Sequence, residues 1–258
     1  MGMDACMLCP RMCGVNRESG EKGYCGMDGK LRAARAALHM WEEPCISGTR
    51  GSGAVFFTGC NLRCCFCQNR EIAIGDSGLE ITEERLAEIF LELQEKGANN
   101  INLVTPGHFA PQITEALRRA KKEGLRLPVV YNTSSYESAD TIKSLEGLVD
   151  IYLPDYKYYS SYYAGLYSHA QDYRDFAVPA IDEMVRQTGA PQFDENVVND
   201  REGKAFVPGK RERADDLRHI VCTCNEIDVG GAFALKREKG GGETFLCNHS
   251  ACGLSAAD

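Results

Sequence analysis

The sequence predicts an α/β fold built on a parallel sheet, preceded by a small cysteine-rich segment. Strand-like apolar runs alternate with amphipathic helices between residues 54 and 189, and four of the thirteen cysteines fall in the first 25 residues. Strands that alternate with helices lie parallel, because each helix returns the chain to the same edge of the sheet. A length of 258 residues suits one large domain with a small appendage.

Residues 1–52 form the cysteine-rich segment, which we expect to be irregular apart from a short helix at 30–41. The N-terminus lacks the apolar core of a secretion signal. The chain also contains no apolar run of about 18 residues, so we expect no membrane span and a cytoplasmic location. In a reducing compartment, a cysteine-rich chain is expected to bind metal more often than it forms disulfides.

The first strand–helix unit combines a buried strand at Ala54–Thr58 with a helix at 81–97. Four apolar side chains follow the helical period: Leu86, Ile89, Phe90 and Leu93. Thr82 is the expected N-cap of this helix, and Gly97 is expected to end it.

Three further units follow the same rhythm. The expected strands are 100–106, 127–134 and 149–157, and the expected helices are 109–124, 138–148 and 172–189. The resulting domain is assigned to residues 53–196.

Residues 197–258 do not continue this rhythm. They combine charges of both signs with a glycine run at 239–243, and four cysteines are spread among them. We expect a divergent, poorly ordered tail, because so little apolar surface offsets the entropy of ordering. The spacing of Cys222, Cys224, Cys247 and Cys252 fits no standard zinc motif, so we expect no metal there.

A loop directly after the first strand carries the chemistry. In the string AVFFTGCNLRCCFCQN, Cys60, Cys64 and Cys67 have the spacing Cys-x3-Cys-x2-Cys, and Gly59 allows a tight turn at the strand end. Three thiolates on an iron–sulfur cube would leave one iron open to a small molecule, since electron-transfer clusters usually take four. Cys65 allows a second register, but ligation by Cys65 and Cys67 would be cramped, so we choose Cys64.

The resemblance to a known family extends beyond this loop. Six stretches carry it: CMLCPRMCGVNRESGEKGYCG, HMWEEPCISG, FFTGCNLRCCFCQN, NINLVTPGHF, VVYNTSSYES and DIYLPDYKY. Together they resemble the radical S-adenosylmethionine (radical SAM) superfamily, in particular the pyruvate formate-lyase-activating-enzyme-like proteins, over residues 4–196. The resemblance implies a partial (β/α)6 barrel that is incomplete at its C-terminus if the tail supplies no further units.

The resemblance also implies cofactors and residues that bind them. A 4Fe–4S cluster would be held by Cys60, Cys64 and Cys67, with S-adenosylmethionine (SAM) on the open iron. Phe66 matches the usual aromatic residue of the loop. Asn132 resembles a polar SAM ligand, with a turn residue as its alternative interpretation, and Lys157 resembles the lysine that pairs with the methionyl carboxylate, with a solvated charge as its alternative.

One motif departs from the family. Activating enzymes carry Gly-Gly-Glu after the second strand, where this chain has TPGH. Backbone carbonyls could still meet the methionyl amine at that position.

A second group of cysteines lies near the N-terminus. Cys6, Cys9, Cys13 and Cys25 have the spacing Cys-x2-Cys-x3-Cys-x11-Cys. Four thiolates close a tetrahedral zinc site or hold an auxiliary iron–sulfur cluster, and the spacing does not choose between these metals.

The sequence therefore predicts a radical SAM enzyme that cleaves SAM reductively for hydrogen abstraction, an oxidoreductase-type chemistry. Expected partners are SAM, an electron donor such as flavodoxin or ferredoxin, and a protein substrate if the enzyme activates a glycyl-radical enzyme. The net charge of −8 gives no general nucleic-acid footprint. The alternative is a non-catalytic iron–sulfur or zinc-binding protein, including a degenerate remnant of such an enzyme.

Overall fold

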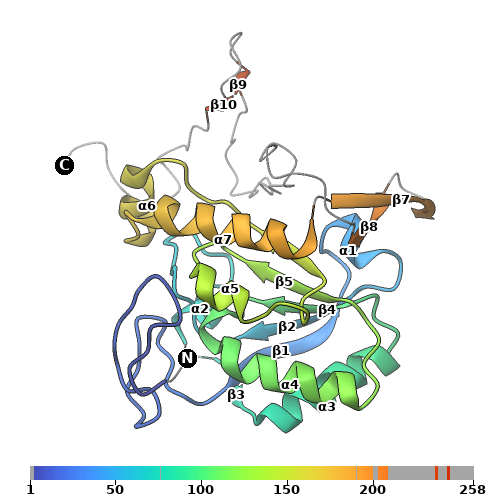
Figure 1. The fold of residues 1–258 in the computed structure, drawn as a ribbon, viewed down its shortest axis with the longest axis horizontal. Coiled ribbons are helices and arrows are strands. Elements are labelled where there is room, and N and C mark those ends of the chain that lie inside the picture. Colours follow the sequence, from blue (N-terminus) through green and yellow to red (C-terminus); the bar gives the residue numbers. More distant parts are fainter. Residues whose placement is uncertain are drawn as a thin grey trace.

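The computed structural model describes residues 3–75 and 77–189, together with strand segments at 191–199, 203–208, 236–237 and 243–244. A six-stranded sheet with the order β3-β1-β2-β4-β5-β6 lies at its centre (Figure 1). None of the described helices has the length and apolar character that crossing a membrane requires.

Four neighbouring strands of this sheet are parallel, which confirms the predicted α/β architecture. They are β2 (Ser52–Phe57), β4 (Ile101–Val104), β5 (Val129–Thr133) and β6 (Ile151–Pro154). In their register Val104 lies beside Asn132, and Asn132 lies beside Leu153. The carboxyl ends of the strands therefore meet at one edge, where the loops that follow them gather.

Helices connect these strands in the predicted order. They are α2 (Arg70–Ile74), α3 (Glu83–Glu95), α4 (Ala110–Lys122), α5 (Ala139–Lys143), α6 (Ser161–Ser168) and α7 (Tyr173–Thr188), with a 3-10 turn, η1 (Gly107–Phe109), before α4. The Thr82 hydroxyl accepts a hydrogen bond from the Arg85 N–H at 3.1 Å, which confirms the predicted N-cap of α3. Two differences are that α5 is shorter than expected and that α6 was not anticipated.

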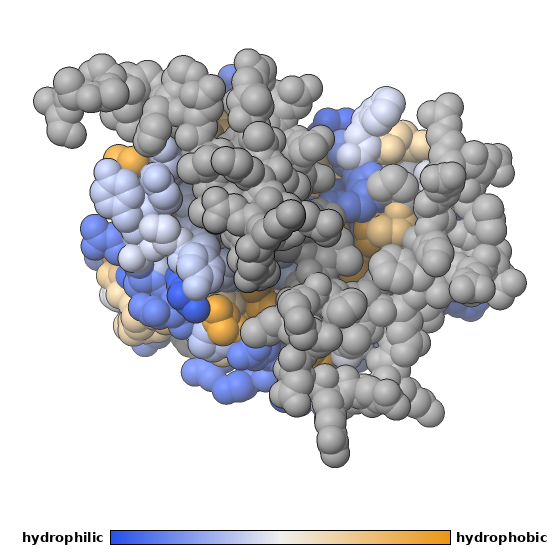
Figure 2. All heavy atoms as spheres, turned by 90° about the horizontal axis from the view of Figure 1, so that it is seen from above, coloured by the Kyte–Doolittle hydropathy of each residue, from blue (hydrophilic) through white to orange (hydrophobic). Residues whose placement is uncertain are grey.

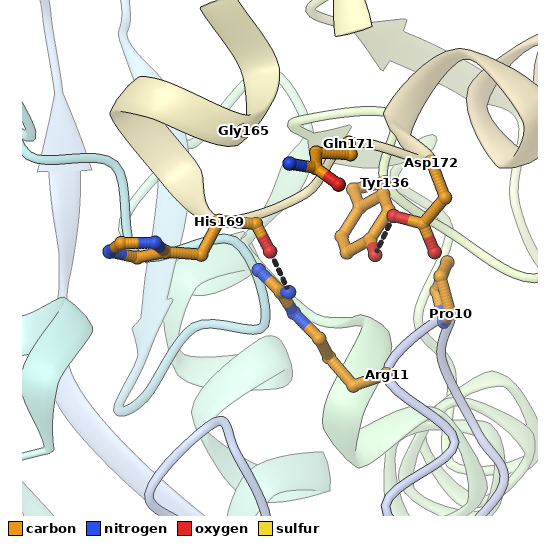
Figure 3. Close-up of a pocket in the computed structure, with 7 residues that line it drawn as sticks. All are labelled: Pro10, Arg11, Tyr136, Gly165, His169, Gln171 and Asp172. Carbon is orange, nitrogen blue, oxygen red and sulfur yellow. Dashed lines mark hydrogen bonds between the residues drawn. The ribbon is translucent and has the colours of Figure 1, made fainter. Parts of the chain in front are cut away.

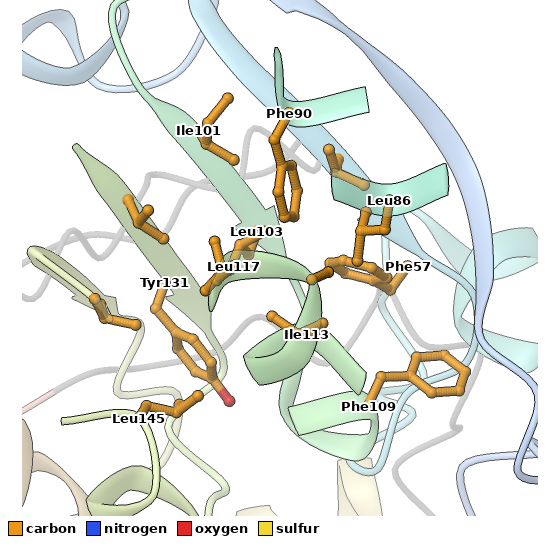
Figure 4. Close-up of a cluster of buried hydrophobic side chains, with 14 of the residues drawn as sticks. Phe57, Leu86, Phe90, Ile101, Leu103, Phe109, Ile113, Leu117, Tyr131 and Leu145 are labelled. Carbon is orange, nitrogen blue, oxygen red and sulfur yellow. The ribbon is translucent and has the colours of Figure 1, made fainter. Parts of the chain in front are cut away.

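The main hydrophobic core lies between the sheet and the helices α3 and α4 (Figure 4). The predicted stripe of α3 supplies Leu86, Phe90 and Leu93, all at most 1% exposed. Phe57 and Tyr131 point into the same core from β2 and β5. Burial of this many large apolar side chains is the main source of the domain's stability.

The prediction of a helix at 30–41 is wrong. These residues form strand β1 (Arg32–His39), which pairs antiparallel with β2 and with the short strand β3 (Leu79–Glu80). Alanine, leucine and arginine are among the best helix formers, but the scale of helix propensity spans only about 0.7 kcal/mol per ordinary residue. The hydrogen-bonding edge of β2 outweighs that preference, because an uncovered edge strand leaves a row of backbone groups unpaired. A short helix, α1 (Pro44–Ser47), follows β1.

Beyond α7 the described strands are antiparallel. β7 (Pro191–Asn199) pairs with β8 (Gly203–Pro208), and β9 (Lys236–Arg237) pairs with β10 (Glu243–Thr244). The boundary predicted at residue 196 falls within β7. Apart from these strand segments, residues 197–258 lie outside the described residues, and so do Cys222, Cys224, Cys247 and Cys252; the expected looseness of the tail and absence of metal stay predictions.

The described part of the upper face carries a mixed surface. Hydrophobic residues are interspersed with hydrophilic ones among the coloured atoms of this view (Figure 2). Such mixing is ordinary for a globular domain, because polar groups alone cannot cover its surface.

Candidate functional site

The cluster loop, residues 58–69, leaves the carboxyl end of β2 and leads into α2. Gly59 has φ +89°, and a Cβ atom there would lie 2.6 Å from the Met27 side chain and 2.8 Å from the Cys25 carbonyl oxygen. Only glycine combines this left-handed conformation with so close an approach. The tight turn predicted at Gly59 is therefore confirmed, and the N-terminal segment packs closely against it.

The structure brings the three predicted cluster ligands together. Cys64 is buried, Cys60 and Cys67 are partly buried, and all three pack with an aromatic group of side chains at this end of the domain. Cys65 is exposed instead. Of the two thiols that distinguish the possible registers, Cys64 is the buried one, and its choice as a cluster ligand stays a prediction.

The surroundings of these thiols set their acidity. Burial raises the pKa of Cys60 to about 11, although backbone N–H groups of Arg63 and Leu62 oppose the shift. The Leu62 N–H lies 3.4 Å from the Cys60 sulfur. Burial also raises the pKa of Cys67, and the Lys157 charge is among the groups that oppose this increase. Donors and cations directed at the sulfurs favour their thiolate forms.

Lys157 follows β6 and lies close to the cluster loop. Its side chain is 21% exposed and forms an ion pair with Asp155. Burial lowers the pKa of Lys157, but Asp155 and the nearby Cys64 and Cys60 more than offset this, so that its pKa is raised. A largely buried, paired ammonium next to the cysteines disfavours the interpretation of Lys157 as a solvated surface charge.

Asn132 lies within β5, so the alternative interpretation as a turn residue is wrong. Its side chain hydrogen-bonds Glu42, which also accepts a hydrogen bond from the Asn102 amide at 2.7 Å. Burial, followed by the neighbouring Glu43, raises the pKa of Glu42 to about 7. Asn102 and Asn132 belong to the sheet face that α1 covers, opposite the helical core.

Phe66 packs against two tyrosines of the same aromatic group. Its ring centroid lies 6.3 Å from that of Tyr158 and 6.1 Å from that of Tyr167, both edge to face. This packing partly buries Phe66 and gives it a structural role beside the one implied by the family resemblance.

The histidine of the TPGH sequence contacts the first residue of the cluster loop. His108 is 2% exposed, and its Nε2 lies 2.7 Å from the carbonyl oxygen of Thr58. Burial lowers the pKa of His108 to about 4, so the ring is neutral and Nε2–H donates to this carbonyl. The histidine that replaces the Gly-Gly-Glu pattern thus holds the start of the loop.

The N-terminal segment also contacts the cluster loop, through the side chain of Arg11. Arg11 donates from Nε to the Asn61 carbonyl at 2.8 Å and from Nη2 to the Ser168 carbonyl at 2.8 Å. Its guanidinium also lies 3.8 Å from the centre of the Tyr24 ring. One side chain therefore joins the N-terminal segment, the cluster loop and the end of α6. Figure 3 shows its further hydrogen bond to the His169 carbonyl. Sequence reasoning missed Arg11, because its partners are backbone carbonyls.

A cavity of about 450 Å³ lies beside Arg11. Its lining residues are Pro10, Arg11, Tyr136, Gly165, His169, Gln171 and Asp172 (Figure 3). The Tyr136 hydroxyl donates to Asp172 at 2.7 Å. The predicted cluster ligands and Lys157 are not among these lining residues.

The first cysteine group also assembles. Cys6, Cys9 and Cys25 are 5–7% exposed. A Cβ on Gly23 would lie 3.1 Å from the Cys13 sulfur and 3.6 Å from the Cys25 sulfur, so these two sulfurs flank the same glycine. Burial raises the pKa of Cys9 to about 12, and Cys25 and Cys6 are close enough to contribute.

Across residues 3–75 and 77–189, no three His, Cys, Asp or Glu side chains converge on a position for a single metal ion. A 4Fe–4S cube spreads its cysteine ligands over several irons, so its ligands need not converge on one point. The soft thiol donors of the cluster loop, which lie near one another, fit such a cluster.

Comparison with known proteins agrees with this geometry. Residues 54–177 match the model of the radical SAM superfamily, which supports a radical SAM domain in this chain. The parallel sheet with its helices is consistent with a partial radical SAM barrel.

One curated relative is Uncharacterized protein MJ0674 of Methanocaldococcus jannaschii. It is 30% identical over 160 residues, which cover 59% of this chain and 45% of that protein. The match thus spans less than half the length of the relative.

Proposed function

We propose that this protein is a radical SAM enzyme, with a 4Fe–4S cluster on Cys60, Cys64 and Cys67 and SAM on the open iron. The observation that carries the proposal is the inward placement of these cysteines within the matched domain, while Cys65 faces outward. Soft thiolates suit iron–sulfur clusters. When bound, the two cofactors supply reductive cleavage of SAM to a 5′-deoxyadenosyl radical, which abstracts hydrogen from a substrate.

The protein's own residues bind and orient these groups. Lys157 would pair with the methionyl carboxylate, and Asp155 holds the Lys157 ammonium in place. Phe66 packs with Tyr158 and Tyr167, which limits the access of water to the loop.

Asn132 would hydrogen-bond another polar group of SAM. In this structure it bonds Glu42, so we expect Asn132 to face both the cofactor and this carboxyl group.

The finer assignment to activating-enzyme-like proteins is also part of the proposal. It rests on the six sequence stretches quoted above, and it implies an oxidoreductase that works in the cytoplasm with flavodoxin or ferredoxin as electron donor. Its substrate would be a protein whose glycine loses a hydrogen atom. The alternative function is metal binding without catalysis, as in a remnant enzyme with an incomplete barrel.

Anaerobic reconstitution separates these two functions. The full chain is loaded with iron and sulfide, reduced with dithionite and incubated with SAM, and 5′-deoxyadenosine is then measured by chromatography. We expect 5′-deoxyadenosine from the wild type and from Cys65→Ala, but none from Cys64→Ala. A wild-type protein that holds the cluster without releasing 5′-deoxyadenosine is a metal-binding protein and contradicts the proposal.

A further inference from the structure

Arg17 is a buried cation that has no carboxylate partner among the described residues. It is 1% exposed, and two of its nitrogens, Nε and Nη2, donate to the Asp28 carbonyl at 2.9 and 2.7 Å. Nη1 donates to the His108 carbonyl at 2.6 Å. Within the described part of the chain, no carboxylate lies at ion-pair distance from this guanidinium, since the Asp28 carboxylate faces Arg32 instead.

A guanidinium keeps its proton in proteins, so Arg17 carries its charge wherever it is buried. Backbone carbonyls satisfy its hydrogen bonds, but they carry no net charge. A buried charge without an opposite charge is costly, and buried charges in proteins are paired for this reason. The position of Arg17 therefore indicates an anionic group close by.

The groups beside Arg17 that can supply this charge are cysteines. Nη1 lies 3.9 Å from the Cys6 sulfur, and the charge of Arg17 also acts on Cys25. Cys9 and Cys13 complete the same group of thiols. Neutral thiols would leave Arg17 unbalanced, whereas four thiolates on a divalent ion or on an iron–sulfur cube carry net negative charge.

We propose that Cys6, Cys9, Cys13 and Cys25 bind an auxiliary tetrathiolate metal centre, with Arg17 as its buried counter-charge. The centre is either a zinc ion or an iron–sulfur cluster, and the two have the same thiolate chemistry. The four sulfurs do not converge on one point in this structure, so on binding they would close around the metal, Cys13 and Cys25 from their positions beside Gly23. Groups of this kind that contact metal ligands from outside tune the affinity for the metal.

The centre would also brace the cluster loop. The Cys60 N–H donates to the Cys25 carbonyl at 3.3 Å, and Met27, two residues after Cys25, contacts Gly59. Metal binding would order the N-terminal segment, which has few strands or helices of its own. The loop that carries Cys60 would gain a fixed support from this order.

The metal is tested in a full chain that lacks the other cluster, so that the result does not depend on the proposed radical SAM activity. The background is Cys60→Ala/Cys64→Ala/Cys67→Ala. One sample is reconstituted with zinc alone and a second with iron and sulfide, and bound metal and acid-labile sulfide are measured per chain. The matched protein adds Cys6→Ser and Cys9→Ser, and a control adds Cys45→Ser.

We expect the background protein and the Cys45→Ser control to retain metal that the Cys6→Ser/Cys9→Ser protein loses. Retention of zinc without sulfide assigns zinc, and retention of iron with sulfide assigns a cluster. Equal metal in all three proteins would place it elsewhere in the chain, and no metal in any of them would also overturn the proposal.

The role of Arg17 is tested separately by equilibrium competition with a chelator, which measures the affinity of the protein for the metal. We expect Arg17→Gln to weaken metal binding by about tenfold or more, the typical effect of losing such a partner. Arg17→Lys keeps the charge and should restore most of the affinity. Circular dichroism of the metal-loaded proteins reports whether each variant folds. A folded Arg17→Gln protein with wild-type affinity would rule out the counter-charge.

Discussion

The backbone N–H of Cys60 donates a hydrogen bond to the carbonyl of Cys25 at 3.3 Å. This contact joins the first cysteine of the cluster loop to the last cysteine of the N-terminal group. The side chain of Arg11 adds a second link, from the N-terminal segment to Asn61. The loop is therefore shaped from outside the barrel as well as by the strand that precedes it.

We expect Arg11→Met to loosen the cluster loop. The substitution removes hydrogen bonds from a charged donor to the carbonyls of Asn61 and Ser168, and such bonds are each worth about 1.5–3 kcal/mol. Hydrogen exchange of the amides at 60–68 should accelerate by roughly tenfold or more. Arg174→Met is the matched control, because Arg174 stacks on the exposed ring of Tyr159. Equal exchange in both variants would contradict a clamping role for Arg11.

The choice of cluster ligands is open to direct test. Cys60→Ala, Cys64→Ala and Cys67→Ala should each abolish the visible absorption of the 4Fe–4S cluster, because each removes one of only three protein ligands. Cys65→Ala should retain the absorption, since Cys65 is exposed. The measurement is made in a Cys6→Ser/Cys9→Ser background, which removes any auxiliary centre. If Cys65→Ala lost the cluster absorption and Cys64→Ala retained it, Cys65 and not Cys64 would be the cluster ligand.

Lys157→Ala should weaken the binding of SAM while leaving the cluster intact. A charge-assisted hydrogen bond to a carboxylate is worth about 1.5–3 kcal/mol, so the Kd should rise roughly tenfold to a hundredfold. Equilibrium binding of SAM to the reconstituted protein measures the effect, and the visible spectrum reports the cluster. Lys143→Ala, at an exposed ion pair on α5, is the control. An unchanged Kd in Lys157→Ala would leave Lys157 with no role in binding SAM.

Gly59 and Gly20 form a matched pair, because both have φ +89°. At Gly20 a Cβ would meet open space, whereas at Gly59 it would meet Met27 and the Cys25 carbonyl. Gly20→Ala should therefore cost only the left-handed strain of about 1–2 kcal/mol. Gly59→Ala should cost a further ~1–3 kcal/mol from overpacking, measured as the free energy of unfolding in urea. Equal decreases in the free energy of unfolding of the two variants would show that the contact between Gly59 and the N-terminal segment leaves no less room for a side chain than at Gly20.

His108 gives the domain a predictable dependence on pH. Burial lowers its pKa to about 4 in the folded protein, whereas an unfolded histidine titrates near 6.5. The unfolded chain thus binds the proton first as the pH falls, so stability from the neutral ring is complete above pH 6.5. This contribution to the free energy of unfolding declines as the pH falls toward 4, by on the order of 2–3 kcal/mol.

His108→Asn should reduce this dependence. Urea unfolding at pH 7.5 and pH 4.5 gives the free energy of unfolding of both proteins. The difference between the two pH values should be smaller in the variant, because asparagine does not titrate. A difference as large as in the wild type would mean that other groups cause the acid sensitivity.

Local patterns in the sequence were sufficient for the parallel part of the fold. The periods of apolar residues located β2, β4, β5 and β6 with their helices, because each of these elements buries one face against the same core. The N-cap Thr82 and the turn at Gly59 followed from local backbone chemistry as well. The spacing of the cluster cysteines reflects contacts within a single short loop, so it too is visible in the sequence.

Tertiary structure decided what depends on distant partners. β1 is a strand only because the edge of β2 offers it hydrogen bonds, against the helical preference of its own residues. Asn132 meets Glu42 across the sheet face, and Arg17 reaches the His108 carbonyl from the N-terminal segment. Buried charges and strand edges are both stabilised by contacts between residues that lie far apart in the sequence. Only folding brings those residues together, so local sequence patterns do not reveal these contacts.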